Sequence, residues 1–277
     1  MKSSALKCIL LVFIVILIPS ITGSNNNPPQ ENKSFFAEGE ELLYEVSWSG
    51  IKIGTILLKI LPDEGVNDVR HRAAATIDSY AGLPFVNVHL VAFTEMDSGF
   101  NSLSSFSVEK RDEDWRRLMY HYNLSEKKIY VEEAFQDDRD SQPHDALVRD
   151  TIHLTRIPIQ DGISLIFIAR HLLRTRKLLS YPTVSNEKLG ETFFYPSRPH
   201  SKVNIDAWKK PIPVVELSGK MKLEGIVGLS GDFKGWFSDD SEAIPITAQM
   251  KVILGSVKIE LKQWNREGWN PPDKEMK

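Results

Sequence analysis

Hydrophobic and polar residues alternate along most of this chain, which is the pattern of β-strands with one buried face. Leu42, Tyr44 and Val46 fall on one face of a first strand, and a second alternating run follows Ser49-Gly50. A turn at this dipeptide would make the two runs a β-hairpin. The same pattern predicts further strands at 69–80, 92–98, 102–109, 118–123, 128–134, 191–195, 202–208, 214–223, 232–238, 244–254 and 256–264.

One stretch, residues 161–180, breaks this alternation and has helical spacing. Asp161 can accept a backbone N–H bond at its start, and Pro182 would end it because proline has no N–H to donate. The pattern predicts one helix about 30 Å long, at 1.5 Å per residue. Its apolar positions share one stripe: Leu165, Ile168, Ala169, Leu172 and Leu173.

The first half of this predicted helix is apolar on every side, because Ile163, Ile166 and Phe167 lie off the stripe. Such a segment needs to be covered all round, so we expect it in the hollow of a curved sheet. The three residues would then line an apolar ligand site, with Trp48 as a candidate from the sheet. The expected fold is mainly β: a strongly curved antiparallel sheet, an open or half barrel, with one long helix against its concave face.

The N-terminus has the pattern of a secretory signal. Lys2 and Lys7 accompany an apolar run at 8–19, which is shorter than the roughly 20 residues that a membrane span needs. We expect residues 1–23 to be a cleaved signal peptide, with an uncleaved membrane anchor as the alternative. Cys8 is the only cysteine, so the processed protein would have no disulfide and no cysteine-based site.

The rest of the chain is expected to form a single domain. Residues 24–34 are polar and predict a disordered tether, residues 35–264 a single β-rich domain, and residues 265–277 a loose tail. The net charge of the chain is −3, which does not favour nucleic acid as a partner. Once processed, the protein is not expected to span a membrane.

No motif for enzyme chemistry stands out. The sequence has no G-x-S-x-G, P-loop, G-x-G-x-x-G or H-E-x-x-H pattern, and its seven histidines are scattered without a metal-ligand spacing. Asp239 and Asp240 could form an acid pair, but adjacent residues of this kind favour a turn. We therefore predict no catalytic residue, no metal and no cofactor.

Three short stretches together resemble a bacterial family of exported proteins known as domain of unknown function 3108. They are Gly39-Glu40-Glu41-Leu42 through Gly54-Thr55, Asp161-Gly162-Ile163-Ser164, and Trp236-Phe237-Ser238-Asp239-Asp240 followed by Ile244-Pro245-Ile246. Members usually have proline where this chain has Gly162. The resemblance implies the periplasm or cell envelope of a Gram-negative bacterium and, by looser analogy, the unclosed barrel of lipoprotein carriers; it implies no activity.

These observations favour one leading hypothesis over two alternatives. The first is a non-enzymatic periplasmic or cell-envelope protein that binds or carries an apolar, lipid-like molecule. The second is an envelope assembly or interaction protein, with a solid core, protein partners and no small-molecule ligand. The third, a hydrolase with a site built from distant acids and histidines, has no specific support in the sequence.

Overall fold

The computed structural model describes residues 36–65, 68–84, 86–111, 113–144, 147–173, 178–185, 187–223, 231–251 and 255–273. The predicted signal peptide at 1–23 and the tether at 24–34 lie outside the described residues.

The described residues form a mainly β fold, as predicted, with one continuous sheet and the short helix α2 (Ser164–Leu172). All strand pairs in the sheet are antiparallel. The strands are β1 (Glu41–Trp48), β2 (Ile51–Leu61), β3 (His71–Ser79), β4 (His89–Met96), β5 (Ser102–Arg111), β6 (Asp114–Asn123), β7 (Lys128–Gln136), β8 (Leu147–His153), β9 (Leu179–Ser185), β10 (Lys188–Phe194), β11 (His200–Ile205), β12 (Trp208–Leu223), β13 (Gly231–Ser238), β14 (Pro245–Lys251) and β15 (Ser256–Asn265).

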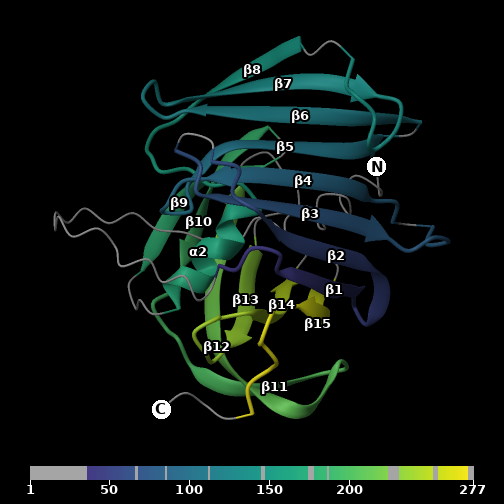
Figure 1. Ribbon diagram of the computed structural model, residues 1–277, viewed down its shortest axis with the longest axis vertical. Helices are drawn as coiled ribbons and strands as arrows, with labels where there is room; N and C mark the ends of the chain where they lie inside the picture. The colour runs from purple at the N-terminus through teal and green to yellow at the C-terminus, as the bar shows by residue number, and fades with distance from the viewer. Residues whose placement is uncertain are drawn as a thin grey trace.

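The sheet has two limbs that meet where β1 pairs with β15 (Figure 1). In the first limb, β1 to β8 follow one another as a meander. In the second limb the order is β15, β14, β13, β12, β10 and β9, and β11 also pairs with β12. The outermost strands β8 and β9 are not neighbours, so the sheet is open rather than a closed barrel.

A short segment before the helix links the two limbs across this opening. The N–H of Ser102 in β5 donates to the Ile159 carbonyl at 3.3 Å. In β9, the N–H of Val184 donates to the Gln160 carbonyl at 2.9 Å, and the Gln160 N–H donates to the Pro182 carbonyl at 3.1 Å. These bonds hold the curved sheet in a barrel-like form although its strand ladder does not close.

The predicted hairpin at the start of the domain is confirmed. Strands β1 and β2 pair about Ser49 and Gly50, whose φ angles are 48° and 87°. Two-residue hairpin turns of this type need positive φ at both central positions, and glycine adopts such an angle without strain. The turn residues therefore set the register of the first pair of strands.

The predicted long helix is wrong in its length. Helix α2 has nine residues, about 13 Å at 1.5 Å per residue, although it begins close to where Asp161 predicted. From Leu179 onward, the chain forms β9 and pairs with β10 instead of continuing a helix. Pro182 lies inside this strand, which it can do because β9 is at the edge of the sheet.

Helix α2 lies where the two limbs face each other (Figure 1). Leu165, Ile168 and Leu172 of the predicted stripe are buried, at 0%, 3% and 5% exposure, which confirms that this stripe faces the core. They belong to one apolar cluster with inward-facing residues of β1–β4 and β12–β15. The helix therefore fills the middle of the curved sheet.

Two residues after β15, Arg266 and Trp269, are packed against the domain, at variance with the loose tail predicted for 265–277. Arg266 forms an ion pair with Glu40, just ahead of β1. Trp269 is buried, its indole N–H donates to Asp240 at 2.9 Å, and its ring meets the Trp264 ring edge-on at 5.7 Å. The Arg266 ion pair and the Trp269 hydrogen bond join this segment to residues far away in the sequence, which its composition does not reveal.

Candidate functional site

An apolar cavity of about 80 Å³ lies between α2 and the inner faces of both limbs. Ile166 and Ala169 line it from the helix. The remaining lining residues come from β1–β3 and from β12–β15: Tyr44, Ile56, Leu58 and Ala75 from the first limb, and Leu217, Phe233, Gly235, Phe237, Pro245, Thr247, Ala248 and Ile259 from the second.

Small side chains at several of these positions create the space. Ala169 on the helix, Ala75 on β3 and Ala248 on β14 each carry a single methyl group toward the region that larger residues would fill. Gly235 is the register partner of Ala248, so two of the smallest residues adjoin on β13 and β14. A Cβ atom at Gly235 would lie 3.0 Å from the Phe237 ring, so this ring occupies the place of a side chain.

The hydroxyl groups that border the cavity are already hydrogen-bonded. Tyr44 donates from Oη to the Pro245 carbonyl at 3.1 Å, and Thr247 donates from Oγ1 to the Ile259 carbonyl at 2.7 Å. Burial, together with the negative charge of Glu40, raises the pKa of Tyr44, so its phenol stays neutral at physiological pH. The cavity is therefore suited to hydrocarbon and not to a charged group.

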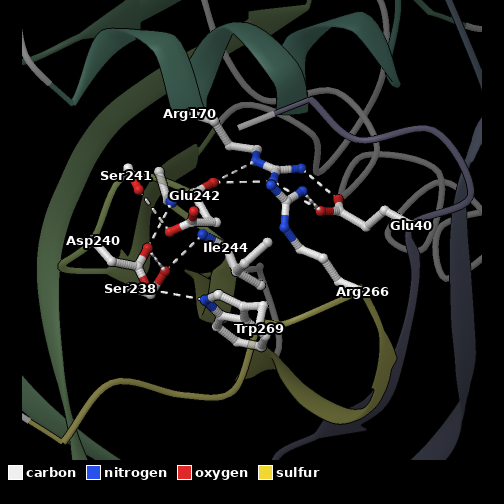
Figure 2. A network of polar contacts seen from close by, with 10 residues as sticks. Glu40, Arg170, Ser238, Asp240, Ser241, Glu242, Ile244, Arg266 and Trp269 are labelled. Atoms are coloured by element: carbon white, nitrogen blue, oxygen red, sulfur yellow. Dashed lines mark hydrogen bonds and ion pairs between the residues drawn. The ribbon is translucent and has the colours of Figure 1, made fainter. Parts of the chain in front are cut away.

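A buried charge network lies toward the C-terminal end of α2 (Figure 2). Arg170 follows the lining residue Ala169 and donates to both carboxylate oxygens of Glu40, at 2.6 and 3.0 Å. Its guanidinium also donates to the Glu242 carbonyl, and Arg266 forms a second ion pair with Glu40. Glu40 and Arg170 are each 2% exposed, so this network ties the helix to both ends of the folded chain.

A second buried polar cluster begins the helix. Asp161 accepts the backbone N–H groups of Ile163 and Ser164 through Oδ1, at 2.8 and 3.0 Å, as the predicted capping role requires. Thr94 and Ser102 donate to Oδ2 at 2.5 and 2.7 Å. Burial raises the pKa of Asp161, although these hydrogen bonds act in the opposite direction. The cluster explains the helix start and does not border the cavity.

Of the four residues predicted to bind a ligand, the structure places Ile166 on the cavity. Phe167 is fully buried instead among aromatic rings, with centroids 5.3 Å from Phe36 and 6.4 Å from Phe100. Ile163 is 2% exposed in the core, and Trp48 packs against the core from a partly buried position. None of these three is among the residues that line the cavity.

Sequence reasoning missed the small residues and the aromatic residues of the second limb that line the cavity. Gly235 and Ala248 occupy inward positions in strands whose residues alternate between the two faces of the sheet. Small residues at inward positions signal reduced side-chain volume in the core. That signal becomes specific only when the strand register brings these positions together opposite the helix.

The described part of the chain contains no group of three or more His, Cys, Asp or Glu residues placed to hold a metal ion. The predicted turn role of Asp240 is confirmed, because it accepts the Ser238 hydroxyl and the Ala243 N–H between β13 and β14. Its neighbour Asp239 instead pairs with His200 at 2.9 Å. In the described part of the chain, no helix is long and apolar enough to cross a membrane.

No family model and no curated protein matches this chain. The fold is similar to the crystal structure of a β-barrel-like protein of domain of unknown function 1849 from Brucella abortus. The TM-score is 0.52 at 10% identity, over 82% of this chain and 96% of that one. A protein with a YmcC-like fold from Bacteroides fragilis also matches, with a TM-score of 0.35 at 9% identity, over 84% of this chain and 100% of that one.

The resemblance to domain of unknown function 3108 is wrong. No family model supports it, and the Brucella protein of similar fold belongs to domain of unknown function 1849 instead. Short motifs of glycines, acids and prolines at turns recur in many β-rich chains, because the turns themselves demand these residue types. At 10% identity, the likeness to the Brucella protein shows the fold alone.

Proposed function

We propose that this protein is a non-enzymatic binding or carrier protein, which holds the hydrocarbon part of a lipid-like molecule between α2 and the sheet. The observation that carries this proposal is the apolar cavity, whose bordering hydroxyls are already hydrogen-bonded. The cavity walls offer water few hydrogen-bond partners, so a hydrocarbon chain can displace water from it at little cost. Each methylene group that moves from water into such a site contributes about 0.8 kcal/mol.

The proposal places the protein in the periplasm of a Gram-negative bacterium. The support is the signal-like pattern of residues 1–23. Mature protein from the envelope fraction should begin between Gly23 and Asn25 and lack the Cys8 thiol, which sequencing its N-terminus and a thiol assay would check. An inner-membrane protein that retains Cys8 would contradict this part of the proposal.

The second candidate function is an envelope assembly or interaction protein. The complete burial of Ile163 and Phe167 favours it, because one side of the helix has the solid packing of an ordinary core. In that case the cavity would be a packing defect without a ligand, since folded domains contain a few such voids.

Calorimetric titration separates the two functions, with dodecanol below its solubility limit and dodecanoate below its micelle concentration. We expect saturable binding to wild type and none to Ala248→Leu, whose larger side chain would fill the cavity from β14. Ala81→Leu, at an exposed turn position, is the matched control and should bind as wild type does.

The same proteins can be tested for a natural ligand. Organic extracts of protein purified from an envelope fraction should contain a lipid by mass spectrometry, and extracts of Ala248→Leu should not. The carrier function would be contradicted if the calorimetric titration shows no binding to wild type. It would also be contradicted if wild type and Ala248→Leu give the same heat of binding. Co-purifying proteins with a lipid-free extract would then support the interaction role.

A further inference from the structure

We infer that the ligand enters tail-first: the methyl end of an unbranched hydrocarbon chain occupies the cavity, while the polar head group stays outside the protein. This inference rests on the proposed function and adds to it the class of ligand and the direction in which the ligand binds. Three properties of the cavity carry it, namely its size, the state of its polar neighbours, and the position of its partly exposed lining residues.

The size of the cavity favours a narrow chain over a ring. Its volume is about 80 Å³. A cavity of about 150 Å³ inside a protein core accommodates one benzene ring. The present cavity is about half that size, so sterols and aromatic molecules are excluded, whereas the end of an unbranched alkyl chain fits.

The polar neighbours of the cavity cannot receive a head group. The hydroxyl hydrogens of Tyr44 and Thr247 are donated to the Pro245 and Ile259 carbonyls. Burying a carboxylate or phosphate beside them would remove its hydration without replacing it, which is strongly unfavourable.

The buried cation of the helix, Arg170, already has hydrogen-bond partners as well. Arg170 engages Glu40 through two nitrogens and the Glu242 carbonyl through two (Figure 2). An anionic head group could reach this guanidinium only by displacing the Glu242 carbonyl or the buried Glu40, which also pairs with Arg266. Breaking a buried ion pair in this way would leave a buried charge without its partner.

The lining residues also differ in exposure. Ile166, Gly235, Pro245 and Ala248 retain partial accessibility, whereas the other lining residues are buried. We therefore place the entry beside Ile166 and Ala248, whose side chains line the cavity and remain partly accessible. A chain that passes this point would direct its methyl end toward the buried side of the cavity.

Two fluorescent probes with the label at opposite ends test the direction of entry. In the first, a dansyl group is attached to the nitrogen of dodecylamine, so the methyl end is free. In the second, a dansyl amide is attached to the terminal carbon of dodecanoic acid, so the carboxylate is free. Fluorescence anisotropy with wild type should rise on titration with the first probe and stay flat with the second. Ala248→Leu should bind neither, and Ala81→Leu should match wild type.

Unlabelled competitors test the class of ligand. Dodecanol, dodecylamine and dodecanoate should displace the first probe with affinities within a few-fold of one another, because the head group stays in water. Dodecanedioate, with a carboxylate at each end, should not compete. Each methylene that enters the cavity contributes about 0.8 kcal/mol, or about fourfold in affinity, whereas methylenes outside it contribute less. Shortening the chain should therefore weaken binding by at most about fourfold per methylene removed.

The outcomes separate this inference from the proposed function. Binding of the second probe, or competition by dodecanedioate, would overturn tail-first entry while leaving a lipid-binding function in place. Failure of every probe and every unlabelled alcohol or acid to bind wild type would remove the proposed function, and the inference with it.

Discussion

Ile166 and Phe167 are neighbours in the same helix, yet they meet different surroundings. Phe167 is fully buried, and the rings of Phe36 and Phe100 lie close to it. Ile166 is partly exposed and lines a cavity with Gly235 among its walls. The contrast teaches that the binding potential of an apolar helix is decided by the volumes of the residues that face it, and not by the helix itself.

The largest expected effect is a loss of stability on the packed side of the helix, at Phe167. Phe167→Ala should lower the free energy of unfolding by about 3–5 kcal/mol, the range for emptying a fully packed phenylalanine site. Urea denaturation would measure it, with Phe135→Ala as control, because Phe135 is 41% exposed and should change stability by less than about 1 kcal/mol. A small effect at Phe167 would mean that the packed side also tolerates empty space.

A loss of similar size is expected where the helix joins both chain ends. Glu40→Gln should cost about 3–5 kcal/mol, because it leaves the buried guanidinium groups of Arg170 and Arg266 without their shared anion. Glu41→Gln is the matched control. Its ion pair with Lys59 is exposed, and exposed pairs contribute about 0–1 kcal/mol. Equal unfolding free energies for the two variants would show that the Glu40 network is not a structural link.

Truncating a residue on the cavity side of the helix should lower the free energy of unfolding by less. Ile166→Ala should cost about 1 kcal/mol, below the roughly 2–5 kcal/mol for truncating a fully packed isoleucine or leucine, because part of its surface already faces open space. Leu165→Ala, one residue away and fully buried, should fall within that higher range and serves as the reference. If the two variants unfold at the same urea concentration, the two sides of the helix do not differ in packing.

The smallest expected effect concerns the helix start and depends on pH. Burial raises the pKa of Asp161, so the folded protein binds this proton more tightly than the unfolded chain does. The free energy of unfolding should therefore fall as pH rises from the unfolded value, about 3.9 for aspartate, through the raised folded value. Asp161→Asn keeps an acceptor oxygen for the Ile163 and Ser164 N–H groups and should lack this fall.

Urea denaturation of both proteins across the acidic range would measure the difference. The stability of wild type relative to Asp161→Asn should decline over that window and become constant above it. A relative stability that increases with pH would mean that the hydrogen bonds from Thr94 and Ser102 outweigh burial and lower the pKa.

Much of the fold could be predicted because its signals are local. Alternation predicted most strands, and Ser49-Gly50 and Asp161 marked a hairpin and a helix start whose defining contacts lie between neighbouring residues. The length of the helix could not be predicted this way. Leu179 and Pro182 belong to β9 because β10 pairs with that segment, and pairing between strands overrides local helical preference.

The candidate site was predicted only in part, since a cavity depends on contacts between distant segments. Helical periodicity correctly indicated an apolar surface at Ile166, but could not show that Phe167 meets Phe36. Nor could it show that the register of β13 and β14 sets Gly235 beside Ala248. Those facts follow from the order of strands in the sheet, which alternation does not encode.

Filling the cavity tests the central claim, that this space is a ligand site rather than a packing defect. Calorimetric titration with dodecanol should show saturable binding to wild type and none to Ala248→Leu, while urea denaturation should show that the variant is folded and about as stable as wild type. Loss of binding in a folded protein is the predicted result. No binding to wild type, or the same affinity in a folded Ala248→Leu, would contradict the account.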